Sequence, residues 1–272
     1  MNMVKCAYAV LDFTDIGEKG FNISISDNSV NKTGLGFKGL CDSYLYCLSY
    51  RDIAIAVTEI CDNRLKINNE CIFEYEKIIE NLMKDSSLLP FRFGTAFKDD
   101  IEIVRLLKEQ YDKFYLNLQK VKNKLEYGLK VMWDYEEAGQ KLIPFSYLKE
   151  NKRTFDILEG SSLYRKYLVN RFKKYKHEEA LIKSAENIIN DIYFSLEEVS
   201  SFSTFKKMLT KKIILDANFL VEKEKEDKFI NRFKEIKQRR KDLKFLFTGP
   251  WPPYSFTDNY IPTREGLING LQ

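Results

Sequence analysis

The chain has 272 residues, 44% of them hydrophobic and 14% aromatic, which is enough to bury a substantial core in one large domain or two small ones. Because 44 Lys and Arg residues are balanced by 40 Asp and Glu residues, the formal net charge is only +4 and does not require a polyanionic partner. No apolar run approaches the ~18 residues of a membrane span, and Asp12 interrupts any signal-peptide core, so we predict a cytoplasmic protein without membrane contact.

Residues 1–98 are predicted to form an N-terminal α+β domain. Apolar runs, turn residues and the helical spacing of apolar residues distinguish its elements. In chain order we expect a buried strand at 5–13, a loop with short strand pieces at 14–43, strands at 44–49 and 53–59, and a helix at 71–84.

The stretch LLPFRFGTAF, residues 88–97, alternates with the period of two that is typical of a strand, opened by Pro90. We expect Phe91 and Phe93 to lie in the core. Arg92 is interpreted as one half of an ion pair between domains or as an interface charge, and Gly94 as a point of close backbone packing.

Residues 99–124 have the clearest periodicity in the chain. Apolar residues spaced three, four, three and four apart predict one long helix that links the two domains. The same spacing occurs in coiled coils and in helices packed along the core of their own protein, and we expect the second. The apolar stripe consists of Val104, Leu107, Tyr111, Phe114, Leu118, Val121 and Leu125.

Residues 125–248 are predicted to form a second domain. The order strand, helix, strand, strand, helix, strand is the ferredoxin-like βαββαβ arrangement, so the predicted fold class is α+β with two domains. The expected elements are a strand at 125–133, a polar stretch to 160, a helix at 161–198, strands at 204–210 and 212–221, a helix carrying Phe229, Phe233 and Ile236, and a strand at 243–247.

Residues 249–272 form a predicted C-terminal tail that begins with GPWPPYSF. Its three prolines exclude both a helix and a central strand, because each ring removes a hydrogen-bond donor and fixes φ. We therefore predict a stiff, extended segment in which Pro250, Pro252 and Pro253 are conformational locks and Gly249 is the hinge out of the last strand.

Two large rings of this tail, Trp251 and Tyr254, are expected on one side of the extended segment, about 9 Å apart. A stiff segment loses little entropy when it docks. Two interpretations therefore stay open: the tail straps the core of its own chain, or it contacts a partner directly.

No catalytic, cofactor or metal site is predicted. Gly34, Gly36 and Gly39 have the spacing of the dinucleotide fingerprint, but a strand-like aromatic segment follows where pyrophosphate binding needs a helix. His177 is the only histidine and lies among charged residues, so a zinc site or a His-based triad has no support. The five cysteines form no Cys-x-x-Cys pair and are interpreted as free thiols.

RNA-recognition domains share the βαββαβ order predicted for the second domain. Two basic runs, residues 171–176 and 237–241, are present. The third strand of the second domain, however, lacks the glycine and the adjacent aromatic pair on which RNA bases stack, so no nucleic-acid partner is predicted. A ferredoxin-like regulatory or RNA-binding module is the alternative function.

LLPFRFGTAF at 88–97 and LFTGPWPPYSF at 246–256 resemble the two signature stretches of the gas vesicle protein F/L family, and the resemblance covers nearly the whole chain. It implies a non-enzymatic accessory protein, a minor component of gas vesicles, that binds the small hydrophobic shell subunit and other accessory proteins at nucleation. Tyr75, where many relatives carry histidine, and Thr257, where valine is common, depart from the pattern. The candidate partner-contact residues are Pro90, Phe91, Arg92, Phe93, Gly94, Gly249, Pro250, Trp251, Pro252, Pro253, Tyr254 and Phe256.

Overall fold

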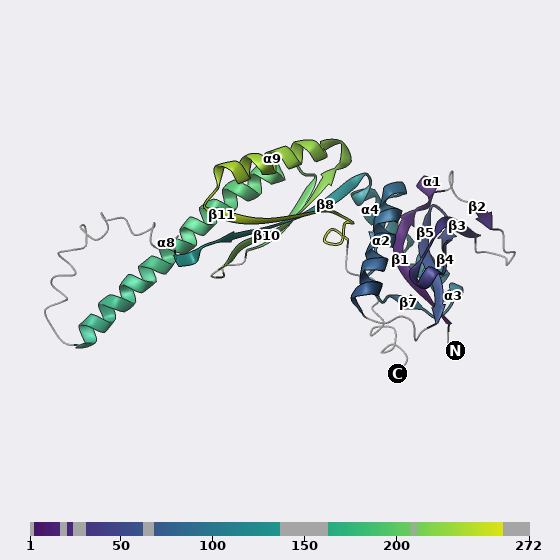
Figure 1. Cartoon of the computed structure of the whole chain (residues 1–272), viewed down its shortest axis with the longest axis horizontal. Helices are drawn as coiled ribbons and strands as arrows, with labels where there is room; N and C mark the ends of the chain where they lie inside the picture. The colour runs from purple at the N-terminus through teal and green to yellow at the C-terminus, as the bar shows by residue number, and fades with distance from the viewer. Residues whose placement is uncertain are drawn as a thin grey trace. The chain divides into compact units, whose positions relative to one another are not determined.

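The computed structural model divides into two compact units, each built from a sheet and helices (Figure 1). Unit 1 combines Met1–Glu126 with Pro250–Gln272, and unit 2 is Tyr127–Gly249. The predicted division set 99–124 apart as a linking helix and 249–272 as a separate tail; in the structure the helical segment and the tail from Pro250 onward belong to unit 1. The structure describes residues 3–16, 21–23, 31–61, 68–136, 163–207, 210 and 212–257.

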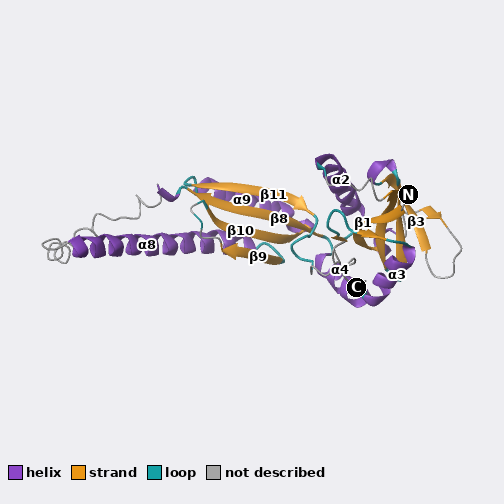
Figure 2. Cartoon of the chain, turned by 90° about the horizontal axis from the view of Figure 1, so that it is seen from below, coloured by secondary structure: helices purple, strands orange, loops and turns teal. Residues whose placement is uncertain are grey.

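Unit 1 is an antiparallel sheet with helices on both sides. Figure 2 shows α2 on one side and α3 and α4 on the other. The strand order is β2-β3-β4-β5-β1-β6, with β7 also paired to β1. The strands are β1 (Met3–Asp12), β2 (Phe21–Ile23), β3 (Asn31–Lys38), β4 (Tyr44–Tyr50), β5 (Ile53–Cys61), β6 (Leu88–Pro90) and β7 (Ala96–Phe97); the helices are α1 (Phe13–Ile16), η1 (Leu40–Asp42), α2 (Asn69–Asp85), α3 (Asp100–Glu109) and α4 (Tyr111–Val121).

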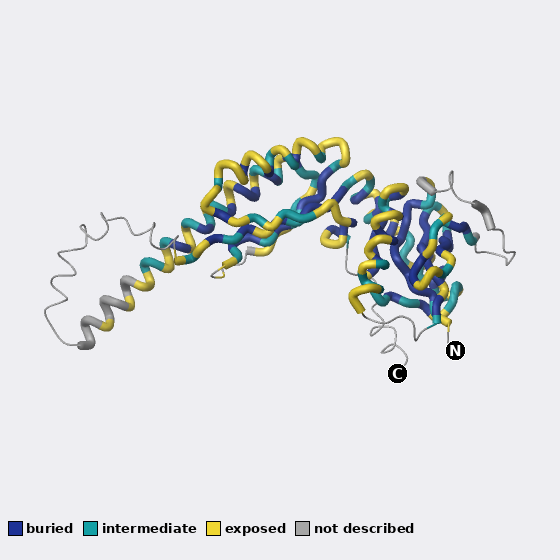
Figure 3. Tube along the Cα trace, viewed as in Figure 1, coloured by how far each residue is buried: buried dark blue, intermediate teal, exposed yellow. Residues whose placement is uncertain are grey.

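Strands β1 and β5 form the centre of this core. Residues 5–12 of β1 and 53–58 of β5 are buried on both faces, as the dark stretches of Figure 3 show. A strand covered on both faces reads as a continuous apolar run, which is why the first strand could be predicted from its sequence. The predicted strands at 44–49 and 53–59 and the helix at 71–84 are confirmed as well.

The single long helix predicted for 99–124 is wrong. The segment forms two helices, with Gln110 between them at φ −109° and ψ 14°. The apolar spacing continues across the break because the inner residues of both helices pack on the same sheet. Periodicity records which residues face inward and does not detect a local break in the helical hydrogen bonds.

Two further predictions for unit 1 are corrected. Residues 88–97 are not one strand but β6 and β7, which both pair with β1 and are separated by a turn at 91–95. Within the predicted loop at 14–43, residues 31–38 form β3, an eight-residue strand with an irregular register between Gly34 and Lys38. Residues 17–20 and 24–30 of that loop lie outside the described chain.

Unit 2 has a sheet of order β11-β8-β10-β9 with α8 and α9 on one face. Phe219 of β10 contacts both Tyr193 of α8, at 5.7 Å between ring centroids, and Phe229 of α9, at 5.4 Å. These contacts place both helices over the same face. The elements are β8 (Lys124–Trp133), α8 (Leu163–Glu197), β9 (Phe202–Lys207), β10 (Ile213–Glu222), η3 (Lys223–Lys225), α9 (Glu226–Arg239) and β11 (Leu243–Trp251).

The protein is therefore an α+β protein with two antiparallel sheets. Strand β11 runs four residues beyond the predicted end at Phe247, and most of the polar stretch expected before residue 160 lies outside the described residues. None of the described helices is long and apolar enough to cross a membrane.

Candidate functional site

Residues 90–95, within the first signature stretch, hydrogen-bond to the edge of β1 in unit 1. The Phe91 N–H donates to the Tyr8 carbonyl at 2.7 Å, and the Ala7 N–H donates to the Thr95 carbonyl at 2.9 Å. Phe91 is fully buried and meets the Phe97 ring edge-to-face, whereas Phe93 is half-buried. The expected core position is thus found for Phe91 in full and for Phe93 in part.

The turn inside this stretch explains why it is not a continuous strand. Both the Thr95 N–H and its hydroxyl donate to the Arg92 carbonyl, at 3.1 Å and 2.8 Å. Gly94 has φ +89°, and a Cβ placed there would meet nothing within 4 Å. Its role is conformational, because side chains disfavour this φ, and the predicted close packing at Gly94 is wrong. The Arg92 side chain is exposed.

Tyr75 of α2 contacts the same stretch through both its ring and its hydroxyl. Its ring stacks on Tyr8 at 5.1 Å and meets Phe93 edge-to-face at 5.3 Å. Its hydroxyl lies 3.0 Å from the Phe91 carbonyl and 3.1 Å from that of Ala7. Burial raises the pKa of Tyr75 well above its ordinary value, so this hydroxyl is a donor. Sequence periodicity placed Tyr75 on the apolar face of its helix but gave no sign of this polar role.

The second signature stretch belongs to unit 1 from Pro250 onward, and we call residues 250–257 the strap. Its first two residues, Pro250 and Trp251, end β11, and because β11 is an edge strand it tolerates the proline. Gly249, just before it, has φ +120°, a value that glycine adopts readily. The predicted hinge at Gly249 has a conformational basis in this value.

The strap does not continue as a straight polyproline II segment. The Tyr254 N–H donates to the Pro252 carbonyl at 2.7 Å and the Phe256 N–H to the Pro253 carbonyl at 3.3 Å, so the chain turns after Trp251. Pro252, Pro253 and Phe256 are buried. The prolines hold the chain stiffly only up to the turn, and local hydrogen bonds fix the rest.

Two residues distant in sequence, Glu126 and Lys120, anchor the strap through its polar groups. The Glu126 carboxylate accepts from the Ser255 N–H at 2.8 Å and from the Ser255 hydroxyl at 2.6 Å. The Lys120 ammonium donates to the Phe256 carbonyl at 3.1 Å. Because buried polar groups that lose their partners carry a large penalty, these bonds fix the strap in one position.

Trp251 and Tyr254 are both 39% exposed. Each ring thus has one part packed in the chain and one part in water. The two interpretations of the tail are compatible in this geometry: the buried prolines and Phe256 form a strap on unit 1, while the rings leave surface for a partner.

Burial shifts the pKa values of two residues at the strap, Glu126 and Tyr254. Burial raises the pKa of Glu126, partly offset by the two hydrogen bonds from Ser255. Burial also raises the pKa of Tyr254, and the carboxylates of Glu76 and Glu126 add to that effect. Glu126 is 5% exposed and makes no ion pair with a described cation. Among the described residues, the hydrogen bonds to its carboxylate come from the neutral donors of Ser255.

This burial predicts a pH dependence. The folded chain binds the Glu126 proton more tightly than the unfolded chain, whose pKa is near the ordinary value of 4.5. Stability is therefore highest below that pH and falls as pH rises through the folded pKa. Relative to Glu126→Gln, which stays uncharged and can still accept a bond from Ser255, the wild type should lose melting temperature as pH rises from about 4 to 7.

Thermal melts of both proteins across that range measure the difference. The matched control is Glu109→Gln, which replaces an exposed carboxylate of α3. The difference in melting temperature between this variant and the wild type should not change with pH. If the difference in melting temperature between Glu126→Gln and the wild type were also independent of pH, the Glu126 carboxylate would titrate as it does in water.

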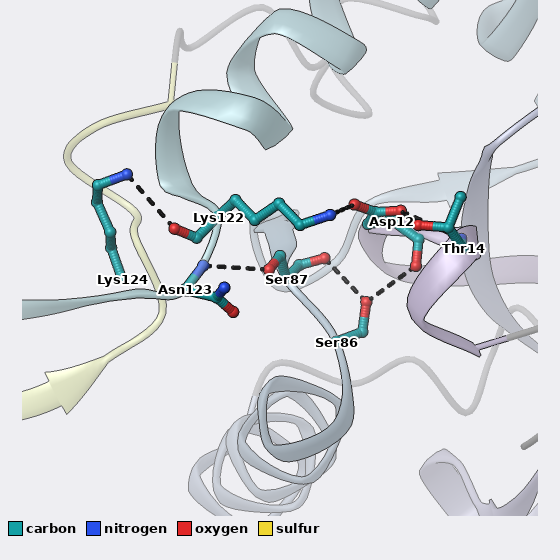
Figure 4. Close-up of polar contacts among 7 residues, drawn as sticks. All are labelled: Asp12, Thr14, Ser86, Ser87, Lys122, Asn123 and Lys124. Atoms are coloured by element: carbon teal, nitrogen blue, oxygen red, sulfur yellow. Dashed lines mark hydrogen bonds and ion pairs between the residues drawn. The ribbon is translucent and has the colours of Figure 1, made fainter. Parts of the chain in front are cut away.

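A polar network fixes the chain where it enters β8 (Figure 4). The Lys122 ammonium lies 2.8 Å from the Asp12 carboxylate, and the Ser86 hydroxyl donates to the Asp12 carbonyl at 3.2 Å. Burial alone raises the pKa of Asp12, but the hydrogen bonds from Lys122 and Thr14 outweigh it and leave the pKa below its ordinary value. This network positions α4 and hence Lys120, one of the strap anchors.

Sequence reasoning missed three polar residues of this site: Lys120, Glu126 and Ser255. The only signal available was the position of Ser255 inside the proline and aromatic motif. Glu126 lies next to apolar residues in a strand, a pattern that predicts an exposed carboxylate. Its burial follows from the strap that covers it.

Fold and site together define a structural protein: an α+β chain whose two signature stretches brace a sheet and anchor a terminal segment. The family model described as "Gas vesicle synthesis protein GvpL/GvpF" matches residues 7–258, so this chain belongs to the GvpL/GvpF family. Members of this family are structural gas vesicle proteins and not enzymes.

Known relatives are distant in sequence and close in fold. Gas vesicle protein F1 of Halobacterium salinarum is 20% identical over 224 residues, covering 81% of this chain and 84% of that protein. Gas vesicle protein F of Dolichospermum flosaquae is 23% identical over 236 residues, covering 85% and 94%. The crystal structure of GvpF from Anabaena sp. PCC7120 superposes with a TM-score of 0.72 at 19% identity, covering 94% of this chain and 98% of that one.

Proposed function

We propose that this protein is an accessory assembly factor of gas vesicles. It binds the small hydrophobic shell subunit and other accessory proteins and acts at the nucleation of the shell. The observation that carries the proposal is the pair of half-exposed rings, Trp251 and Tyr254, on an anchored strap. Aromatic rings held rigidly at a surface are typical of binding hot spots, because they bury a large area with little loss of entropy.

The chemistry of a shell subunit supports this role. A small hydrophobic subunit exposes apolar faces and strand edges before it is incorporated, and such surfaces aggregate unless something covers them. This chain offers matching surface: the strap rings, and the edge strand β9 with Phe202 and Phe205 each almost half-exposed. A factor of this kind would keep subunits soluble and deliver them to the growing shell, as a minor component of the vesicle.

We also infer that unit 2 is a ferredoxin-like domain. Its element order is strand, helix, strand, strand, helix, strand, and its sheet order β11-β8-β10-β9 corresponds to 4-1-3-2 in the numbering of the unit's own strands. This is the arrangement expected of two interleaved βαβ halves. No observation in the described residues favours the regulatory or RNA-binding alternative for this domain.

Co-expression with the shell subunit tests the proposed function. The affinity-tagged chain should increase the fraction of subunit found in the soluble lysate and should retain it through purification. The matched controls are the subunit expressed alone and the subunit expressed with the tag on an unrelated α+β protein. A subunit that neither gains solubility nor co-purifies would refute this mechanism.

A further inference from the structure

Rings and cations gather at the turn between β4 and β5 of unit 1. The Arg51 guanidinium carbon lies 5.3 Å from the centre of the Tyr50 ring and 4.7 Å from that of Tyr111. The Lys108 ammonium lies 5.7 Å from the Tyr50 ring centre, and Tyr115 stacks on Tyr111 at 6.0 Å. We call Tyr50, Arg51, Lys108, Tyr111 and Tyr115 the Tyr-Arg patch.

The backbone at Arg51 is in an unfavourable conformation. Its φ is 55°, in the left-handed region that Asn and Gly adopt far more readily than arginine does. The turn by itself therefore gives no reason for an arginine at this position. The cation–π contacts with Tyr50 and Tyr111 favour an arginine here and keep its guanidinium beside the two rings at the surface.

Both cations of the patch lack a carboxylate partner among the described residues. Asp52, the acid next to Arg51, instead accepts the Tyr111 hydroxyl at 2.5 Å. Neither Arg51 nor Lys108 takes part in an ion pair within the described chain, and both side chains are exposed. The Tyr50 and Tyr111 rings meet at 86°, so the guanidinium cannot lie flat on both, and its exposed N–H groups can reach a planar anion.

We propose that the Tyr-Arg patch binds the carboxylate side chains of an acidic peptide segment in a protein partner. Arginine pairs with a carboxylate through two parallel hydrogen bonds, and the tyrosine faces accept the apolar residues of the same segment. The carboxylates of Asp52, Glu109 and Asp112 lie on the same turn and helices. These carboxylates oppose any anion, and the repulsion grows with its charge, so the patch suits a short segment that brings one or two carboxylates rather than a continuous polyanion such as RNA.

The test uses the full-length chain with isotope-labelled tyrosines and a short synthetic peptide that alternates glutamate with leucine. The peptide should shift the resonances of Tyr50, Tyr111 and Tyr115 and leave that of Tyr193 in unit 2 unchanged. A counterpart peptide with glutamine in place of each glutamate should produce no shift. Failure of the glutamate peptide to bind, or equal binding of the glutamine peptide, overturns the proposal.

The decisive variant is Arg51→Asn, because asparagine suits the left-handed backbone and the fold is expected to persist. Its affinity for the glutamate peptide should be at least about tenfold lower, which corresponds to loss of a charge-assisted pair. The matched control is Arg105→Asn, which removes another exposed arginine on α3 and should bind as the wild type does. Wild-type affinity in Arg51→Asn refutes the proposal.

Two other ligands of the Tyr-Arg patch, a phosphate group and a second copy of the chain, would give different results with the same labelled protein. If inorganic phosphate shifts the three tyrosines at lower concentration than the peptide does, the patch recognises a phosphate group and the proposal is wrong. If sedimentation velocity shows a dimer that Arg51→Asn dissociates, a second copy of the chain occupies the patch, which also overturns it. A monomer unaffected by phosphate supports the acidic segment.

Discussion

Trp251→Ala is expected to reduce the yield of gas vesicles at least about tenfold, because a hot-spot ring contributes roughly 2 kcal/mol or more to binding. Its effect on folding should be smaller. A ring that is already 39% exposed loses only part of the burial energy, so we expect the free energy of unfolding to fall by about 1–2 kcal/mol. Vesicle counts by electron microscopy and denaturant unfolding of the purified chain measure the two effects separately.

The matched control is Leu246→Ala, which truncates a side chain of β11 that is 49% exposed and lies before the strap. It should leave vesicle yield unchanged. Phe256→Ala provides the opposite comparison: this ring is buried, so its loss should destabilise unit 1 by about 3 kcal/mol. If Trp251→Ala and Leu246→Ala had the same effect on yield, the exposed tryptophan surface would not be a contact site.

Gly39→Ala is expected to lower the free energy of unfolding by about 3 kcal/mol, the upper part of the range for overpacked cores. A Cβ at this position would lie 2.0 Å from the Thr58 Oγ and 2.8 Å from the Tyr8 hydroxyl, which accepts the Leu40 N–H at 2.9 Å. The φ of Gly39 is −90°, which alanine adopts freely, so the expected loss is steric. Urea unfolding measures it.

Gly36→Ala is the matched control for a conformational effect. Its φ is +77° and a Cβ there meets nothing within 4 Å, so we expect a loss of only about 1 kcal/mol. Thr58→Ala removes the atom nearest to the new methyl group, so the double variant with Gly39→Ala should be less destabilised than the sum of the two single variants. Additive losses would show that the clash is relieved in some other way.

These two glycines also explain the dinucleotide-like spacing in the sequence. Gly36 permits the backbone irregularity of β3, and Gly39 lets the chain pass against Thr58 before η1. The pattern thus has a structural cause in a strand and its exit. Residues 31–38, within the loop with short strand pieces expected at 14–43, form the eight-residue strand β3.

Much of the fold was predictable from local patterns. The apolar run of β1, the strands on either side of Arg51 and Asp52, and the helical spacing around Tyr75 each identify an element, because burial of one face imposes a period on the sequence. The breaks were less predictable. Gln110 interrupts the helical stripe without changing its spacing, and the turn at 91–95 depends on bonds that Thr95 makes to the Arg92 carbonyl.

The amino-acid sequence by itself determined the α+β class, the strand and helix patterns, and, through GPWPPYSF and LLPFRFGTAF, the resemblance to the family. Only the tertiary structure decided that the strap belongs to unit 1, that the buried Glu126 accepts hydrogen bonds from Ser255, and that Arg51 lies beside two tyrosine rings. The physical reason is distance along the chain. Periodicity reports which side of an element turns inward, whereas a pair such as Glu126 and Ser255, 129 residues apart, is selected by the packing of the whole unit.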